Sequence, residues 1–375
     1  MTANVYTLSS GWDLKIKVNE YENVNSNSSL VKRLTASAIF EAERSKLAQS
    51  EHFSTMLRGP WREASSKAIT LEEDNIEVMT VLFRSLHGTL DEIAFNTVSM
   101  KTIWLLIQAC DKYNIDIKTG ALRDWFINWY EVESKRDENQ DGYEFERMVM
   151  YPCYHFDHAV GFQEATLVLV YNSPGHITEK NPTKNNRLHM PPRVIQQMNS
   201  ARGRLRNILS NGLFNDIAAI VEHAKCSCKE TTVFDYLREL QRVKVWPLEN
   251  TMKNASVNDL LHRCRLFKAA NMRRPARGEK TGISGYSLPR SCSCGNDWKG
   301  VVTRAANKVA DNFNGMCLDC MSVTACLRQG RDLDAEYWEH DRMKKWDLKC
   351  RVKHGEPTWW FSFMGQREKR GLLAY

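Results

Sequence analysis

The stretch from residue 45 to residue 88, SKLAQSEHFSTMLRGPWREASSKAITLEEDNIEVMTVLFRSLHG, decides the fold of the first third of this chain. Its first half predicts a short helix, because Phe53, Met56 and Leu57 are spaced to share one helical face. Pro60 ends that helix, since a proline disfavours helical geometry in the residue before it. The first half is therefore a single amphipathic helix followed by a turn.

The second half of the stretch predicts a strand and then a second helix. Ile69 and Leu71 alternate with polar residues, which is typical of a brief strand. Asp74 is placed to cap the helix, with Glu77 three residues later completing a capping box, and Gly88 is placed to end it. The side chains expected to face a core from this helix are Ile76, Met79, Phe83 and Leu86.

The flanking sequence extends the same domain on both sides. Residues 14–18 alternate between apolar and charged side chains, which predicts a half-buried strand. Ser99 can begin a helix whose apolar positions are Ile103, Trp104, Leu106, Ile107 and Cys110, and a further helix carries Leu122, Trp125, Phe126 and Trp129. Strands and helices in this order predict a mixed α/β domain of the α+β type.

The order of parts, S-x-x-F-x-x-M-L, an aromatic and an acidic residue, a strand and a capped helix, resembles a BTB/POZ domain. The segments RSLHG (residues 84–88) and LLIQACDKYNID (residues 105–116) are similar to BTB proteins of filamentous fungi. The resemblance covers residues 10–130. It implies a three-stranded sheet flanked by helices that associates with another protein, often as a homodimer. The sequence departs from the family at Glu22–Ser29, an Asn/Ser-rich run where the family has a compact hairpin.

The composition is that of a globular protein, with 375 residues, 42% hydrophobic and 10% aromatic. No N-terminal segment has the basic start, apolar core and small-residue cleavage site of a secretory signal. The longest apolar runs, such as Ile103–Ile107 and Thr166–Tyr171, are far shorter than a membrane span. We therefore expect an intracellular protein, in the nucleus or cytoplasm, with no membrane partner.

Charge is unevenly divided along the chain. Residues 1–130 hold 14 Lys/Arg against 16 Asp/Glu, whereas residues 131–375 hold 38 against 29. A basic C-terminal part can favour nucleic acid. Scattered charge on a solvated surface explains the same excess more simply, so nucleic acid is not the favoured partner.

The remaining two-thirds of the chain divides into three parts. Residues 131–142 are polar, without apolar periodicity, and predict a linker. Residues 143–270 predict a mainly α-helical region, which starts irregularly near residue 151 and has a break at Gly212. Residues 271–375 predict a loop-rich, Cys-rich region that binds zinc, whose end resembles the C-terminal end of the same fungal proteins. Within that end, alternating Trp359, Phe361 and Phe363 predict a strand.

Nine of the eleven cysteines lie between residues 226 and 350, which favours thiols or metal sites over disulfides in an intracellular chain. Zinc takes four sulfur or nitrogen ligands in a tetrahedron, and closely spaced pairs suit that geometry. Eight candidates would fill two sites, so we predict one or two structural zinc ions. The alternative is that these are buried, reduced thiols. The candidate ligands are Cys226, Cys228, Cys292, Cys294, Cys317, Cys320, Cys350 and His354.

The sequence does not favour an enzyme. The most catalytic-looking cluster is Cys153, His155, Asp157 and His158, but catalytic partners usually converge from distant segments. No phosphate-binding loop, dinucleotide motif or nucleophile elbow is present in the sequence. We therefore predict a non-enzymatic protein-interaction module with a structural-zinc C-terminal region. Two alternatives stay open: a nucleic-acid-associated transcriptional regulator, and a substrate adaptor of a cullin-type ubiquitin ligase.

Overall fold

The computed structural model describes residues 4–26, 29–136, 142–224, 228–272, 297–319, 321, 350–354, 357–359 and 362–363. The chain divides into two compact units. The first contains residues 1–161 and 179–190, and the second contains residues 162–178 and 191–375.

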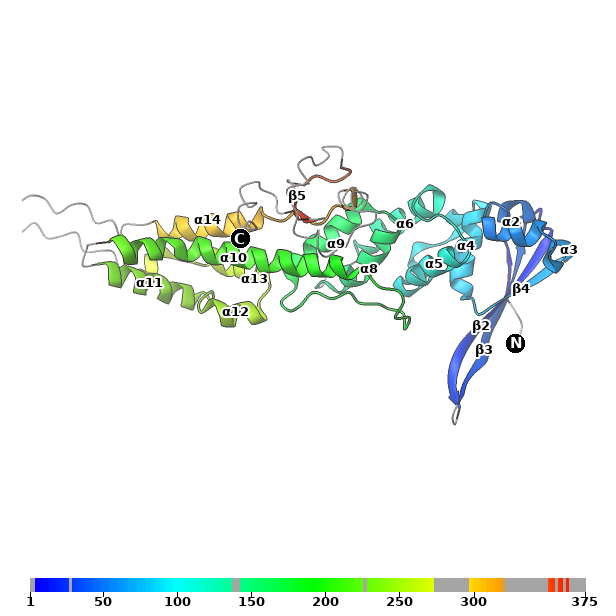
Figure 1. Ribbon diagram of the computed structural model, residues 1–375, viewed down its shortest axis with the longest axis horizontal. Helices are drawn as coiled ribbons and strands as arrows, with labels where there is room; N and C mark the ends of the chain where they lie inside the picture. Colours follow the sequence, from blue (N-terminus) through cyan, green and yellow to red (C-terminus); the bar gives the residue numbers. More distant parts are fainter. Residues whose placement is uncertain are drawn as a thin grey trace, which may run out of the picture. The chain divides into compact units, whose positions relative to one another are not determined.

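A four-stranded sheet begins the first unit (Figure 1). Its strands are β1 (Asn4–Thr7), β2 (Leu14–Ser26), β3 (Ser29–Ala42) and β4 (Ala68–Glu72), in the order β1-β3-β2-β4. β2 and β3 form an antiparallel hairpin, and β1 and β4 add to its two sides in parallel. The sheet has one strand more than the three expected, because β1 also pairs with β3.

One face of this sheet is a core face. Leu14, Ile16 and Val18 of β2 are fully buried, as the alternating pattern predicted. Their partners on β3 are also small or aromatic apolar residues, and Ile16 lies opposite Phe40. Residues between them, such as Lys15, point to the opposite face and are exposed.

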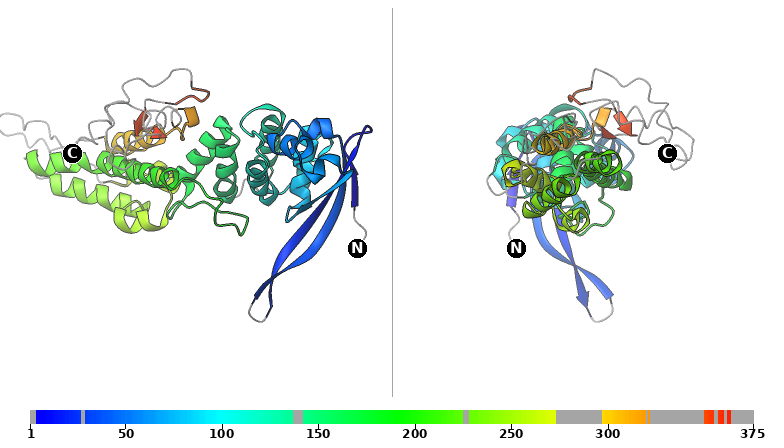
Figure 2. Two further views of the ribbon diagram at one scale, coloured as in Figure 1. Left: turned by 45° about the vertical axis from the view of Figure 1, so that its right-hand side comes forward. Right: turned by 90° about the vertical axis from the view of Figure 1, so that its left-hand side faces the viewer.

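The Asn/Ser-rich run lengthens the hairpin. β4 pairs with β2 only as far as Asn19, yet β2 and β3 stay paired to their ends at Ser26 and Ser29. Figures 1 and 2 show this part as a two-stranded arm that projects beyond the helices of its unit. A register shift after Glu20 marks the place where the arm begins.

The helices of this unit are α1 (Arg44–Leu47), α2 (Glu51–Arg58), α3 (Arg62–Ser65), α4 (Ile76–His87), α5 (Met100–Lys112), α6 (Gly120–Glu133) and α8 (Glu144–His155), with 3-10 turns η1 (Leu90–Glu92) and η2 (Phe95–Thr97). The helix α4 packs on β2 and β3, and α5 packs on α4, so the other helices of the first unit extend its core beyond the sheet. Phe53, Met79 and Phe83 are fully buried, as expected, whereas Ile76 and Leu86, which were also expected to face the core, are only half-buried. α8 runs to His155 with Pro152 inside it, so the irregular stretch expected from residue 151 lies instead at residues 156–158, between α8 and α9.

The cap of α4 differs from the prediction. The N-cap is Asn75, whose side chain accepts a hydrogen bond from the Val78 backbone N–H at 3.0 Å. Asp74 is instead buried, and its carboxylate accepts hydrogen bonds from the Tyr113 hydroxyl at 2.6 Å and from Lys112 at 2.7 Å. Asp74 therefore joins the start of α4 to the end of α5 rather than capping the helix.

The second unit is mainly helical. Its elements are most of α9 (Ala159–Asn172), then α10 (Pro192–His223), α11 (Lys229–Arg242), α12 (Leu248–Asn254), α13 (Val257–Arg265), η3 (Ala269–Asn271), α14 (Trp298–Ala310) and the short strands β5 (Pro357–Trp359) and β6 (Ser362–Phe363). β5 and β6 pair as an antiparallel hairpin rather than one strand. The predicted break at Gly212 was wrong, because α10 runs through it.

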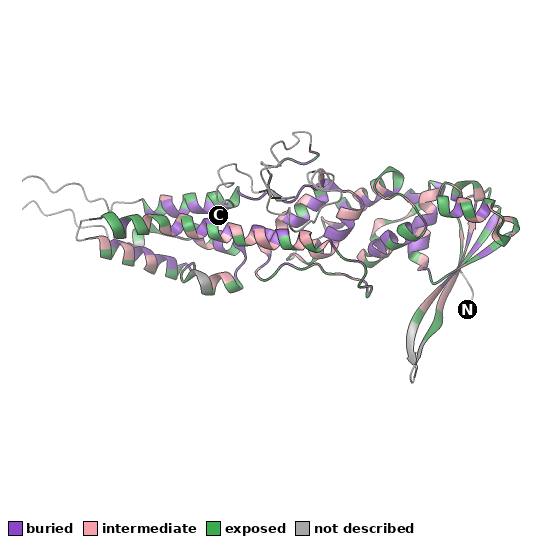
Figure 3. Cartoon of the chain, in the orientation of Figure 1, coloured by how far each residue is buried: buried purple, intermediate pink, exposed green. Residues whose placement is uncertain are grey.

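Gly212 serves packing between α10 and α14. A Cβ at this position would lie 2.7 Å from the Cβ of Ala305, closer than such atoms approach. The two helices can therefore pack closely only because Gly212 has no side chain. Figure 3 shows buried residues on the faces by which α10 and α14 meet.

Among the described residues, the structure has no helix long and apolar enough to span a bilayer.

Candidate metal centre

Three predicted ligands come together in the second unit. The sulfurs of Cys317 and Cys350 and a ring nitrogen of His354 all lie within 4.8 Å of one another. Cys317 is buried, whereas Cys350 and His354 are half-buried. These three side chains can hold a metal ion.

The chain segment that carries Cys317 is held against α9. After α14, the backbone N–H of Met316 donates to the hydroxyl of Thr166 at 2.9 Å. The hydroxyl of Tyr171 donates to the carbonyl of Val309 at 2.8 Å. Side chains of α9 make both hydrogen bonds, so this helix determines the path of the backbone from α14 to Cys317.

Gly315 allows this segment to lie so close to α9. Its φ of +85° is in the left-handed region, which disfavours other residues. A Cβ there would also lie 2.3 Å from the backbone carbonyl oxygen of Gln163. Both the turn and the contact therefore require glycine.

The second segment, which carries Cys350 and His354, is held by two polar contacts. The side-chain amide of Gln163 donates to the carbonyl of Lys353 at 2.8 Å. The Arg351 guanidinium donates to one oxygen of Asp319 at 2.7 and 2.9 Å, and the Arg351 backbone N–H donates to the other at 2.8 Å. The two ligand-bearing segments are thus joined to each other and to α9 without involving the ligands.

The charge on Asp319 is stabilised in this arrangement. Partial burial of the carboxyl acts to raise its pKa, but the hydrogen bonds and charge of Arg351, with the charge of His354, outweigh burial. The net effect lowers the pKa of Asp319 below its usual value. The fork between Asp319 and Arg351 therefore remains an ion pair at neutral pH, where it can hold the two segments in register.

The arrangement suits metal binding in its chemistry. In a tetrahedral zinc site with Zn–S bonds of about 2.3 Å, two sulfurs lie about 3.8 Å apart. The observed separation of no more than 4.8 Å needs only a small inward movement of the side chains. The cluster holds two thiols and one imidazole, as expected of a metal site. A catalytic pair of a cysteine nucleophile and a histidine base needs only one thiol.

Cys317 begins a helical turn. The backbone N–H of Met321 donates to the carbonyl of Cys317 at 3.1 Å, the spacing of one α-helical turn. Cys320, the predicted partner of Cys317, lies outside the described residues, as do Cys226, Cys292 and Cys294. Cys228 is described as the half-buried residue before α11, and it is not a member of the cluster.

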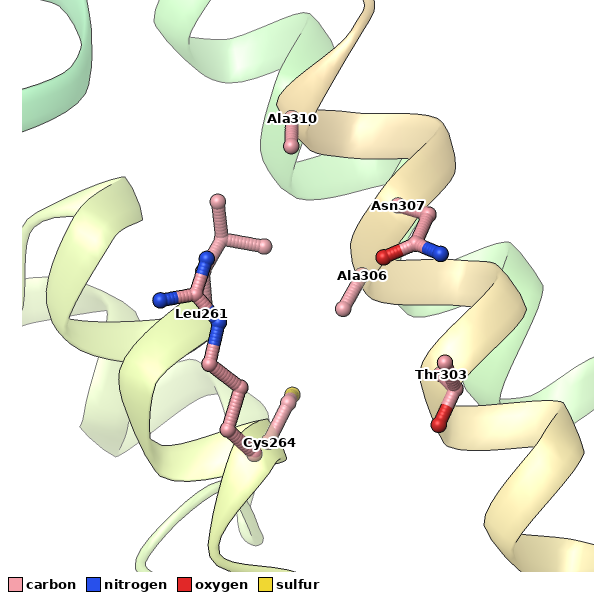
Figure 4. A pocket seen from close by; sticks show the side chains of 7 residues that line it. Leu261, Cys264, Thr303, Ala306, Asn307 and Ala310 are labelled. Carbon is pink, nitrogen blue, oxygen red and sulfur yellow. The ribbon is translucent and has the colours of Figure 1, made fainter.

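Two further cysteines are buried in apolar surroundings. Burial raises the pKa values of Cys110 and Cys264 to about 12, so both remain protonated thiols at neutral pH. Cys264 borders a cavity of about 50 Å³ between α13 and α14 (Figure 4). That volume is far smaller than ordinary ligand pockets, which span several hundred Å³. The lining residues are Leu261, Cys264, Arg265, Thr303, Ala306, Asn307 and Ala310.

The Cys153–His158 cluster is tightly packed at the end of α8. A Cβ on Gly161 would lie 2.4 Å from a ring carbon of His158 and 2.9 Å from the sulfur of Cys153. Burial lowers the pKa of His155 to about 4, which keeps its imidazole neutral at physiological pH. The side chains of this cluster are therefore closely packed within the first unit.

The supporting residues of the metal centre were not anticipated from the sequence. Gln163 and Thr166 are polar residues three positions apart in a mostly apolar helix, so they share one face. That pattern was the available signal for a polar attachment point on this helix. Nothing local marks Asp319 and Arg351 as partners.

In comparisons with known proteins, no protein-family model and no curated protein matches this chain.

Proposed function

We propose that the chain is a non-enzymatic protein-association module whose second unit is stapled by a structural zinc ion. The observation that carries the zinc part is the convergence of Cys317, Cys350 and His354 within 4.8 Å. Two thiolates and an imidazole are ligands that zinc prefers. Such an ion stabilises the fold by tying together segments that are far apart in the chain.

The fourth ligand is proposed from the sequence alone. Cys320 follows Cys317 by three residues, the spacing at which one turn presents two thiolates to one ion. A Cys3His set is closed, with no open position for a substrate, and closed sets are structural sites. This ligand set is the reason for proposing that the metal stabilises the fold and does not act in catalysis.

Cobalt substitution tests the site directly. Co²⁺ added to metal-free, reduced protein is expected to give the intense visible bands of tetrahedral coordination and the near-ultraviolet band of thiolate bonding. The bands should fall by the contribution of one ion in Cys317→Ser and Cys350→Ser and be retained in Cys264→Ser, a matched change of a buried thiol outside the centre. Weak bands typical of six-coordinate cobalt in the unaltered protein would contradict the proposal.

The association part of the proposal comes from the resemblance of residues 10–130 to BTB/POZ domains. A specific feature of the first unit also supports it, namely the arm formed by residues 21–26 and 29–34. Within the described residues no third strand pairs with this arm, and a two-stranded ribbon alone is marginally stable in water. The arm also exposes 49% of Val31 and 41% of Leu34, and open strand edges are templates for pairing with another chain.

An arm-shortened variant tests this role. Replacing residues 22–33 by Asn-Gly keeps the Tyr21–Leu34 pair and closes it with a favoured two-residue turn. We expect the full chain to sediment as a homodimer and the shortened chain to self-associate at least tenfold more weakly. A monomer at high concentration would remove the homodimer from the proposal. An equally stable dimer without the arm would place association on another surface.

A further inference from the structure

The two thiols of the metal centre differ in their access to solvent. Cys350 is half-buried on a short non-helical segment, whereas Cys317 is fully buried. Their sulfurs are no more than 4.8 Å apart. A small oxidant from solvent therefore meets the sulfur of Cys350 first, with that of Cys317 within reach.

We propose that Cys350 is a peroxide-reactive residue and that oxidation converts the zinc staple into a disulfide between Cys350 and Cys317. The thiolate of Cys350 attacks hydrogen peroxide, the O–O bond breaks, and a sulfenic acid and hydroxide form. The thiolate of Cys317 then attacks the sulfur of Cys350, the S–S bond forms and a second hydroxide leaves. Two thiolates are oxidised, one peroxide is reduced, and the zinc ion loses two ligands and dissociates.

The surrounding contacts allow this exchange without unfolding. Disulfide formation needs the sulfurs to approach to about 2.05 Å, a movement that side-chain rotation at Cys350 can supply in part. The backbone on either side is held by contacts that do not use the thiols: the fork between Arg351 and Asp319, and the hydrogen bond from Gln163 to Lys353. The disulfide would therefore keep the two segments together while His354 is released from the metal.

Two other described thiols, Cys110 and Cys264, provide an internal contrast. Cys110 and Cys264 are buried and protonated, and a protonated thiol is a poor nucleophile toward peroxide. We therefore expect the thiols of the metal centre to be oxidised before Cys110 and Cys264. Reduction by a dithiol should reverse the change, because sulfenic acid and disulfide are both recoverable states.

This inference rests on the proposed zinc site, and the experiment separates the two. Zinc-loaded full-length protein is treated with hydrogen peroxide while a chromophoric chelator records released zinc, and the Cys317–Cys350 crosslink is mapped by mass spectrometry of alkylated peptides. The test variant is Cys350→His, which keeps a zinc ligand but removes the reactive thiol. Cys264→Ser is the control and should behave as the unaltered protein.

We expect zinc release to be at least tenfold slower in Cys350→His, and the crosslink to form only when Cys350 is present. Equal release from Cys350→His, or a crosslink from Cys317 to Cys320 in place of Cys350, would overturn the inference while leaving the zinc site intact. Absence of zinc from the reduced starting protein would overturn the proposed zinc site itself.

Discussion

Replacing Asp74 with alanine tests how the first unit is held together. The change removes the acceptor of the Tyr113 hydroxyl, at 2.6 Å, and the ion-pair partner of Lys112, at 2.7 Å. Tyr113 is 1% exposed, so its hydroxyl would be left buried without this acceptor, at a cost of about 1–3 kcal/mol. Lys112 is half-exposed and can turn to water, so loss of its pairing adds less than about 1 kcal/mol.

We therefore expect Asp74→Ala to lower the free energy of unfolding of the first unit by about 2–3 kcal/mol. Urea unfolding followed by near-ultraviolet circular dichroism measures the change, with exposed Asp91→Ala as the control. The double variant Asp74→Ala/Tyr113→Phe removes the orphaned hydroxyl and should recover about 1 kcal/mol. A loss below about 0.5 kcal/mol, or no recovery in the double variant, would refute the reasoning.

Three further predictions test other parts of the molecule. Burial lowers the pKa of His155 from its ordinary value of 6.5 to about 4, so the stability that its neutral form contributes is complete above pH 6.5 and falls by up to about 3 kcal/mol as the pH falls toward 4. The urea midpoints measured at pH 7 and at pH 4.5 should therefore differ less in His155→Gln than in the unaltered protein. An equal difference in the two proteins would contradict this. On α10, Gly212→Ala should destabilise by about 1–3 kcal/mol through the clash with α14. Gly203→Ala, which meets nothing within 4 Å, should stabilise by about 1 kcal/mol, and thermal melts showing the same sign for both would count against the packing argument. Thr166→Val leaves the Met316 backbone N–H without its acceptor and should weaken zinc binding roughly 5–30-fold in chelator competition; unchanged affinity would show that this anchor does not position Cys317.

The parts of the fold that the sequence predicted are those set by local patterns. Alternation at residues 14–18 and helical spacing from Phe53 to Leu57 both correspond to buried faces in the structure. Ser99 caps its helix as predicted, because its hydroxyl meets a backbone N–H three residues later. These features depend only on residues that are close in sequence, so they can be predicted without knowledge of the three-dimensional fold.

The errors arose where a distant residue decides the outcome. Asp74 and Asn75 are both good helix caps, and the choice between them depends on Tyr113, which binds Asp74 from α5. Gly212 has the local character of a break, but Ala305 of α14 makes it a contact point within a continuous helix. Sequence spacing alone cannot supply either partner.

The metal centre shows the same division. Pairing within the sequence identified Cys317, Cys350 and His354 as candidate ligands, because ligand-type residues at short spacing are recognisable locally. The sequence could not say that these two segments meet, since α9 brings them together through Gln163 and Thr166. Only the three-dimensional structure supplies that link.

The most direct test of the central claim is native mass spectrometry of the reduced, full-length protein beside the triple variant Cys317→Ser/Cys350→Ser/His354→Gln. Zinc bound elsewhere, for example at Cys226 and Cys228, would be present in both proteins and cancel in the comparison. The zinc site proposed here predicts that the variant carries one zinc ion fewer per chain. An equal zinc count in the two proteins would contradict it.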